Sequence, residues 1–339
     1  MLAVTPADAG HGRLRRWLRS VGHFAAAASA ARRPLLDPAD AAALIALARG
    51  ADAPASRPVA ARGAGDRPSG FIGRGLDYAE SRAYQPGDDL RDLHWRLLAR
   101  TGRPYVRQHR EEHVATWHLL LDLRPHMAFG TRLRTKAEQA ARAGLLAAAV
   151  QALRADGMQL GLTCWDDAPQ SIALGRGAGA VQRLAQRLAA RSVAAPSGAT
   201  LRGRGADAAF GRWALRLART LPEGSQVVLA GDAAGWDAPE ADAALWGLQA
   251  RATVRLLLVR DPVEAALPAA AALAGAEMVD LAAHRTAVLD SAMLARFAAR
   301  ADAQQSVRLA HWRARGLDCV AAGVDRSDAD LLRALRSAG

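Results

Sequence analysis

The stretch HLLLDL at residues 118–123 is a short apolar run whose single acid is Asp122. Runs of this kind are typical of a parallel strand that is buried on both faces of its sheet. A helical pattern, TKAEQAARAGLLAAAVQALRADG, follows at 135–157 and ends at a glycine, a common helix terminator. The sequence therefore predicts that an α/β unit begins with this strand.

The alternation of strands and helices continues to the C-terminus. Further short apolar strands are predicted at 158–165, 225–232, 253–261 and 317–322. Helical patterns are predicted at 180–191, 207–220, 239–251, 292–316 and 328–338. This alternation favours a doubly wound, mostly parallel α/β sheet over residues 117–339.

The residues ahead of this domain differ in composition. Residues 1–36 contain six arginines and one aspartate, which predicts a basic, mobile arm. Residues 37–69 combine a helical pattern, DPADAAALIALAR at 37–49, with a linker rich in glycine, proline and alanine. Residues 70–116 form a separate segment that mixes aromatic, acidic and arginine side chains. We therefore expect an arm, a linker and a small segment before the α/β domain.

The overall composition narrows the class of protein. The chain has 339 residues, 51% of them hydrophobic, which is enough for roughly two domains. Its net charge is +12, but all of its 45 basic residues except Lys136 are arginine, and the excess is diffuse outside the arm. Diffuse arginine is typical of a solvated surface. Cys164 and Cys319 lie too far apart for a metal or redox pair, and no apolar run is long enough to cross a bilayer. A cytoplasmic location is the expectation.

The segment YQPGDDLRDLHWRLLARTGRPYVRQHREE at 84–112 is dense in charge. Its Pro86-Gly87 pair predicts a turn, and Asp88 or Asp89 is placed to cap a short helix after it. Four leucines of that helix are predicted to face inward: Leu90, Leu93, Leu97 and Leu98. A glycine turn then leads into a return strand. The interleaved acids would repel a nucleic-acid backbone, so internal ion pairs or a protein-docking surface are favoured.

This segment resembles the signature of the DUF58 family, whose pattern runs approximately Y-x-P-G-D-D-x-R-x-I-H-W-x-x-S-A-R-x-G-x-L-x-V-R-x-x-E. The matching positions are Tyr84, Pro86, Gly87, Asp88, Asp89, Arg91, His94, Trp95, Ala99, Arg100, Gly102, Val106 and Arg107. Leu98 stands where the family has a serine, which weakens any role based on a hydroxyl. The resemblance covers about residues 70–339 and leaves residues 1–69 unexplained. It implies no catalytic residues.

The same resemblance implies a von Willebrand factor A-like domain downstream. In such domains an aspartate at the end of the first strand, followed by hydroxyls two and four residues later, binds Mg²⁺. Here Asp122 is followed by Arg124 and His126 at those positions, and Asp232 stands where a further metal-associated acid would lie. Because a guanidinium is positive and has no acceptor, we expect Arg124 to bind Asp122 or Asp232 in place of a cation. The site is then a degenerate metal loop, and we expect Asp122, Arg124, His126 and Asp232 to lie at the rim of a protein-binding loop at the top of the sheet.

The family also implies a role. DUF58 proteins are typically found with MoxR-type AAA+ ATPases and other von Willebrand A proteins, as presumed parts of chaperone-like or complex-maturation systems. We therefore expect a non-enzymatic adaptor that needs no cofactor, metal or nucleic acid and has no transmembrane segment, although membrane-bound partners are compatible with it.

Two alternatives from other classes remain. The first is a nucleic-acid-associated protein that uses the basic arm and the arginines of the 84–112 segment, which are Arg91, Arg96, Arg100, Arg103 and Arg107. The second, least favoured, is a metal-dependent hydrolase in which Asp122 and Asp232 hold a cation. Binding that falls steeply with salt would indicate the first alternative.

Overall fold

The computed structural model describes residues 2–5, 34–50, 72–73, 77–110, 115–131, 134–154, 157–166, 169–193, 206–265, 277–280, 285–288 and 290–337. Most of the predicted arm and almost all of the predicted linker lie outside the described residues. No helix in the described part of the chain is both long and apolar enough to span a bilayer.

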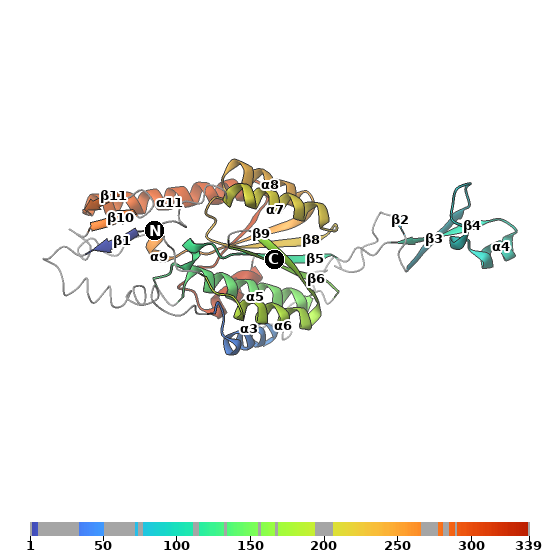
Figure 1. The fold of residues 1–339 in the computed structure, drawn as a ribbon, viewed down its shortest axis with the longest axis horizontal. Helices are drawn as coiled ribbons and strands as arrows, with labels where there is room; N and C mark the ends of the chain where they lie inside the picture. The colour runs from blue at the N-terminus through green and yellow to red at the C-terminus, as the bar shows by residue number, and fades with distance from the viewer. Residues whose placement is uncertain are drawn as a thin grey trace.

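A six-stranded sheet forms the centre of the α/β domain (Figure 1). In sheet order its strands are β12 (Asp318–Ala321), β9 (Ala252–Leu258), β8 (Ser225–Gly231), β5 (Thr116–Asp122), β6 (Gln159–Trp165) and β7 (Pro169–Arg176). Neighbouring strands are parallel except at the edge, where β7 runs antiparallel to β6. The predicted doubly wound, mostly parallel sheet is confirmed.

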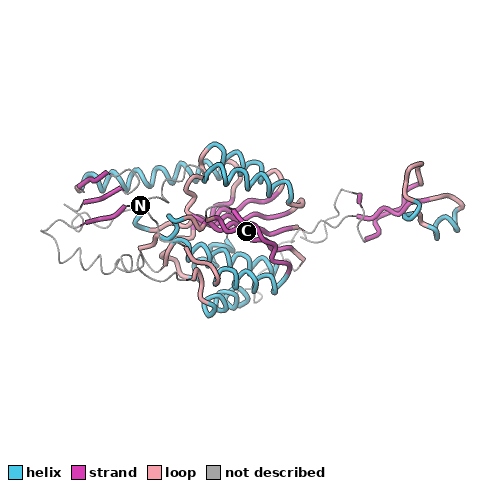
Figure 2. The backbone as a smooth tube through the Cα atoms, in the orientation of Figure 1, coloured by secondary structure: helices cyan, strands magenta, loops and turns pink. Residues whose placement is uncertain are grey.

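Helices cover both faces of this sheet, and Figure 2 shows the strands between the two helical layers. One face packs against α5 (Lys136–Arg154), α6 (Gly177–Ala189) and α12 (Asp328–Ser337), and α3 (Pro38–Gly50) packs on the outer side of α5 and α6. The other packs against α7 (Ala206–Thr220), α8 (Pro239–Gln249) and α11 (Ser291–Ala314). The strands are apolar on both faces because each face meets a helical layer.

Helix α3 is part of the α/β domain, although it precedes the first strand of the sheet by a long stretch of sequence. Its Leu44 and Ile45 are buried in the same core as α5 and α6. Asp40 of α3 also accepts a hydrogen bond from Arg142 of α5 at 2.6 Å, and Arg142 binds Asp328 of α12 on its other side. The helix that we predicted within the 37–69 segment therefore packs on the domain rather than serving as a spacer.

A second, three-stranded sheet pairs residues 2–5 with residues between 277 and 288. It consists of β1 (Leu2–Thr5), β10 (Glu277–Asp280) and β11 (Arg285–Val288), all antiparallel. The pairing places residues 2–5 of the predicted arm in a strand beside a segment near the C-terminal third of the chain. None of these three strands was predicted from the sequence, because four residues are too few to show a period.

The signature segment forms a small unit that we call the signature module, residues 72–110. It contains β2 (Ile72–Gly73), β3 (Asp77–Ala83) and β4 (Tyr105–Arg110), with a 3₁₀ turn η1 (Leu90–Asp92) and helix α4 (Trp95–Thr101) between β3 and β4. The predicted turn is present, with Gly87 at φ 109°, and Asp89 caps η1 by accepting from the backbone N–H of Arg91.

Two details predicted for the 84–112 segment are wrong. The single helix expected after the turn is broken at Leu93, whose buried side chain belongs to a residue bridged to Val106. Leu90 was expected to face inward, but it lies in the 3₁₀ turn and is 62% exposed. The spacing of apolar residues does not say whether another element covers them.

Candidate functional site at the carboxyl edge of the sheet

The polar residues singled out by the sequence meet where the sheet reverses its winding direction. From β5 the chain passes through α5 to β6 on one side, and it later returns to β8 on the other side. Asp122 is the last residue of β5, and Asp232 follows β8 directly. In open α/β sheets the crevice between two such strands is where ligands bind. Asp122 and Asp232 therefore flank the place in this fold that is most suited to a ligand.

Arg124 closes one side of this crevice. Its Nε and Nη2 atoms donate to the two carboxylate oxygens of Asp122 at 2.9 and 2.6 Å, and its backbone N–H donates to Oδ1 at 3.1 Å. Nη2 also donates to the carbonyl of Ala234 at 2.8 Å, and the guanidinium lies 3.9 Å from the centre of the Trp165 ring. The ion pair predicted between Asp122 and Arg124 is present, and Asp122 is fully buried beneath it.

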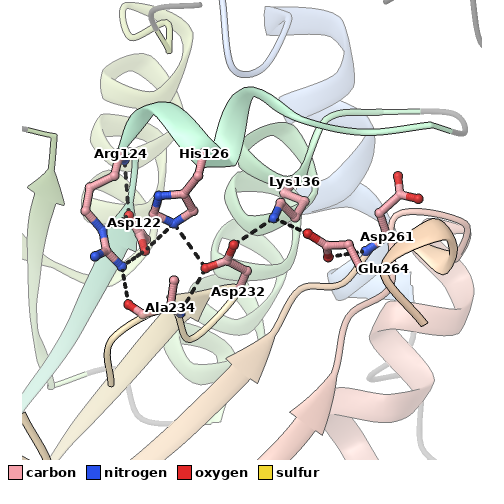
Figure 3. Close-up of polar contacts among 8 residues, drawn as sticks. All are labelled: Asp122, Arg124, His126, Lys136, Asp232, Ala234, Asp261 and Glu264. Carbon is pink, nitrogen blue, oxygen red and sulfur yellow. Dashed lines mark hydrogen bonds and ion pairs between the residues drawn. The ribbon is translucent and has the colours of Figure 1, made fainter. Parts of the chain in front are cut away.

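His126 and Lys136 continue the network on the other side (Figure 3). The Nε2 atom of His126 lies 3.1 Å from Oδ1 of Asp232 and 3.6 Å from Oδ2 of Asp122. The Lys136 Nζ, at the start of α5, donates to Asp232 at 2.7 Å and to Glu264 at 2.6 Å. Basic and acidic side chains thus alternate along a line: Arg124, Asp122, His126, Asp232, Lys136 and Glu264.

The line ends at the half-buried carboxylate of Glu264, on the loop after β9. Glu264 lies in the short helix α9 (Pro262–Ala265) and accepts from the backbone N–H of Asp261 at 3.1 Å. Asp261 in turn accepts from the backbone N–H and the hydroxyl of Thr131. The loops after β5, β8 and β9 are therefore tied together by charge-assisted hydrogen bonds.

The burial and the charges of this network shift the pKa values of its members. Burial would lower the pKa of His126, but hydrogen bonds and charges of Asp122 and Asp232 raise it to about 9. Burial would raise the pKa of Asp232, yet His126 and Lys136 hold it well below the ordinary value. The pKa of Asp122 is lowered in the same sense, mainly by Arg124 acting against burial. At neutral pH these groups are therefore charged, and each charge has an opposite neighbour.

Lys136 and Glu264 were missed as members of the site. Burial would lower the pKa of Lys136, but the charges of Asp232 and Glu264 raise it, so the amine is charged although the residue is only 2% exposed. One signal was available: Lys136 is the single lysine in a chain that otherwise uses arginine for every basic residue. A lysine kept against such a bias indicates a position where a compact ammonium is needed.

These residues do not fit a divalent cation. Ligand atoms of Asp122, His126 and Asp232 do lie within 4.8 Å of one another, a spacing that a metal could use. However, Arg124 lies 2.6 Å from Asp122, and Lys136 lies 2.7 Å from Asp232, so both carboxylates already have cationic partners. A dication between them would meet three positive side chains. The arrangement stabilises two buried carboxylates with the chain's own cations.

Replacing two of those cations by hydroxyls should create a metal site. We expect the Arg124→Ser/His126→Ser variant to bind Mg²⁺ and Mn²⁺, because it has the aspartate-and-two-hydroxyls spacing and lacks the competing guanidinium. Isothermal titration should show heat for this variant and none for the unchanged chain, and Mg²⁺ should raise the unfolding temperature of the variant alone. Arg212→Ser/Arg216→Ser, on the exposed side of α7, is the matched control. Absence of heat from a folded Ser/Ser variant would contradict this explanation.

Strand β8, which ends just before Asp232, needs a glycine at its last position, Gly231. A Cβ placed on Gly231 would lie 2.8 Å from the Cβ of Asp122 and 3.1 Å from Cζ2 of Trp236. We therefore expect Gly231→Ala to lower the free energy of unfolding by about 1–3 kcal/mol, the usual range for overpacking a core. Chemical denaturation measures this loss. Gly50→Ala, where the new methyl meets nothing within 4 Å, should leave the stability nearly unchanged. Equal losses in both variants would show that crowding at residue 231 is not the cause.

The signature residues form a separate group. Arg82 binds Asp88 through two hydrogen bonds of 2.8 and 2.6 Å, and His94 caps α4 by accepting from the N–H of Leu97 at 3.1 Å. Tyr84 is half-buried, whereas eight other members are exposed, namely Pro86, Gly87, Asp89, Arg91, Trp95, Ala99, Arg100 and Gly102. Arg107 lies in β4 opposite Ser81. In Figure 1 the module lies apart from the six-stranded sheet, so the signature and the Asp122 network are two sites.

Comparison with known proteins shows which family and which relatives the chain resembles. The family described as "Protein of unknown function DUF58" matches residues 80–307. Uncharacterized proteins of Mycobacterium tuberculosis and Mycobacterium bovis are 39% identical over 94 residues, which are 27% of this chain and 28% of theirs. The match thus spans little more than a quarter of the length of these relatives.

Two solved structures resemble the chain more distantly, each at 13% sequence identity. An aerotolerance-related membrane protein from Bacteroides fragilis aligns with 66% of this chain and 97% of its own, with a TM-score of 0.37. The conserved hypothetical protein BatB from Bacteroides thetaiotaomicron aligns with 66% and 98%, with a TM-score of 0.34. The family match covers most of the chain and includes the signature from Tyr84 to Arg107, so the chain belongs to the DUF58 family.

Proposed function

We propose that this chain is a non-enzymatic interaction component that works with a MoxR-type AAA+ ATPase in the assembly or maturation of a protein complex. In this proposal the rim around Asp122 and His126 faces a protein partner. The observation that supports it is the occupied crevice: Arg124 and Lys136 fill, with their own charges, the place where the fold would hold a ligand. Family membership supports the association with an ATPase.

The chemistry of the network favours binding over catalysis. Every carboxylate in it has a cationic neighbour within 3.1 Å, and the two protonated bases, His126 and Lys136, are held in the charged form by those carboxylates. A general base needs a free lone pair near neutral pH, which neither group offers. The site is instead a polar region in which hydrogen bonds and ion pairs join the loops after β5, β8 and β9. Such surfaces suit protein recognition, where charge sets specificity.

A pull-down with identification of the captured protein tests the proposal. The tagged full chain is applied to nuclease-treated native lysate, and captured proteins are identified by mass spectrometry. We expect a AAA+ ATPase to be recovered with the unchanged chain and with Arg212→Ser/Arg216→Ser. Arg124→Ser/His126→Ser should change its recovery, because the loop at the rim is altered.

A second variant distinguishes the loss of a contact surface from a folding defect. Ala128→Arg adds bulk and charge to the half-buried rim residue of η2 (Pro125–Ala128) without removing any member of the network. Reduced capture of the ATPase by this variant, with an unchanged unfolding temperature, supports the rim as the contact. Recovery of nucleic acid alone from untreated lysate, with no ATPase in either sample, would overturn the proposal.

A further inference from the structure

Two acids of the signature module, Asp88 and Asp89, accept hydrogen bonds from groups within the module itself. Asp88 accepts two hydrogen bonds from Arg82 and a third from the backbone N–H of Gln85 at 2.8 Å. Asp89 accepts from the backbone N–H of Arg91 at 3.0 Å and so caps the 3₁₀ turn. The sequence predicted that Asp88 or Asp89 caps the element after the turn, and Asp89 does so. In the structure they stabilise the turn, and several arginines are left exposed.

One face of α4 carries exposed apolar and basic side chains. Trp95 and Ala99 lie one turn apart, as do Arg96 and Arg100, so the four side chains share one side of the helix. All four are exposed, Trp95 to 62%. We call this set the α4 face. Among the residues that the structure describes, the guanidinium groups of Arg96 and Arg100 have no acidic partner.

The module has little core of its own to explain an exposed tryptophan. Among the side chains described between residues 81 and 106, the buried apolar ones are Leu93 and Val106. A unit of this size rarely holds a stable fold without further support. Covering Trp95 would therefore add apolar burial that the module lacks. An exposed tryptophan with arginines around it also has the composition of a binding hot spot.

The net charge of the module indicates the chemistry of the partner that it would bind. Residues 77–110 contain seven arginines and five acids, a net charge of +2, and the positive excess lies on α4 and its flanking turns. Arginine binds a carboxylate through two parallel hydrogen bonds. Asp89 and Asp92 lie in the turn just before α4 and would repel a continuous phosphate backbone, whereas a folded partner can place separate carboxylates away from them.

We propose that the α4 face binds an acidic, amphipathic segment of a partner protein, with its carboxylates on Arg96 and Arg100 and an apolar side chain on Trp95. This inference rests on the proposed function as an interaction component and adds the chemistry of the partner. It assigns the signature module a surface different from the rim at Asp122.

Three labelled probes and the full chain test this assignment by fluorescence anisotropy. The first is a peptide of glutamate and leucine with leucines at helical spacing, the second is polyglutamate of the same length, and the third is oligothymidylate. We expect the glutamate–leucine peptide to bind most tightly. Trp95→Ala should weaken that binding about tenfold, and Arg96→Glu/Arg100→Glu by more than tenfold, as is usual for hot-spot residues. Arg212→Glu/Arg216→Glu has the same charge change and spacing on α7, and it should stay within about twofold.

The outcomes separate this inference from the proposed function. Equal losses in the α4 and α7 variants, or equal binding of polyglutamate and the glutamate–leucine peptide, would show a general effect of net charge and overturn the inference. If the pull-down still recovers the ATPase in that case, the proposed function stands without this surface. Tighter binding of oligothymidylate that depends on Arg96 and Arg100 would overturn the inference and favour the nucleic-acid alternative.

Discussion

Arg124→Met should lower the free energy of unfolding by about 3–5 kcal/mol at neutral pH, the range seen when one partner of a buried ion pair is removed. The substitution keeps an unbranched side chain over the Trp165 ring but removes two donors from Asp122 and one from the carbonyl of Ala234. Asp122 would then be a fully buried carboxylate whose nearest remaining cation, His126, is 3.6 Å away. Urea denaturation followed by circular dichroism measures the loss.

A double variant separates the charge from the packing. In Asp122→Asn/Arg124→Met both charges are absent, so no unpaired carboxylate is buried, and much of the lost stability should return. If the double variant is as unstable as Arg124→Met alone, the loss comes from packing against Trp165 or from the carbonyl of Ala234, and the charge argument is wrong. The two variants together therefore measure the coupling between Asp122 and Arg124.

The sequence predicted most of the central sheet because its strands carry a strong local signal. Residues 118–123, 158–165 and 225–232 are short, continuous apolar runs, and each corresponds to a strand. The edge strand β7 was missed. Its sequence, PQSIALGR, alternates only weakly, and most of its residues are exposed. The strong apolar signal of β5, β6 and β8 comes from their burial in the centre of the domain.

The candidate site was predicted in part. Asp122, Arg124 and His126 are close in sequence, and an aspartate at the end of a buried strand is a local signal. Asp232 could be added because parallel strands end at the same edge of a sheet. Glu264 could not be added, because it reaches the network only through Lys136, which comes from the start of α5. Contacts between three separate loops depend on how the loops pack, and no sequence period encodes that.

The exposure of Trp95 and Trp246 shows the same limit. Both belong to amphipathic or mixed helices, where a tryptophan is normally a core residue. Periodicity gives the face on which a side chain lies, but not whether that face meets another element. For Trp95 the missing cover is the basis of the proposed docking surface. For Trp246, beside Arg315 just after α11, no described residue indicates what covers it.

Folding stability should fall by on the order of 3 kcal/mol between pH 6.5 and pH 9, because the pKa of His126 is raised from 6.5 to about 9 in the folded chain. Below pH 6.5 the imidazole is protonated in both states, and its interaction with Asp122 and Asp232 contributes in full. Above pH 6.5 the unfolded chain releases the proton while the folded chain still binds it, so each further rise in pH favours the unfolded chain. The contribution is lost as the pH passes the folded pKa. Denaturation at several pH values up to 8.5 measures the slope, and His126→Gln should remove it.

His118 should produce the opposite slope at lower pH. It is buried beside Thr163, at 2.7 Å between Nε2 and Oγ1, and burial lowers its pKa from 6.5 to about 4. Between these values the unfolded chain binds a proton that the folded chain excludes, so stability falls as the pH decreases from 6.5. The two histidines together predict a stability maximum near pH 6.5, with His126→Gln flattening only the alkaline side and His118→Gln only the acid side. A slope that persists above pH 6.5 in His126→Gln would mean that another group titrates there, and His126 would no longer account for the loss of stability at alkaline pH.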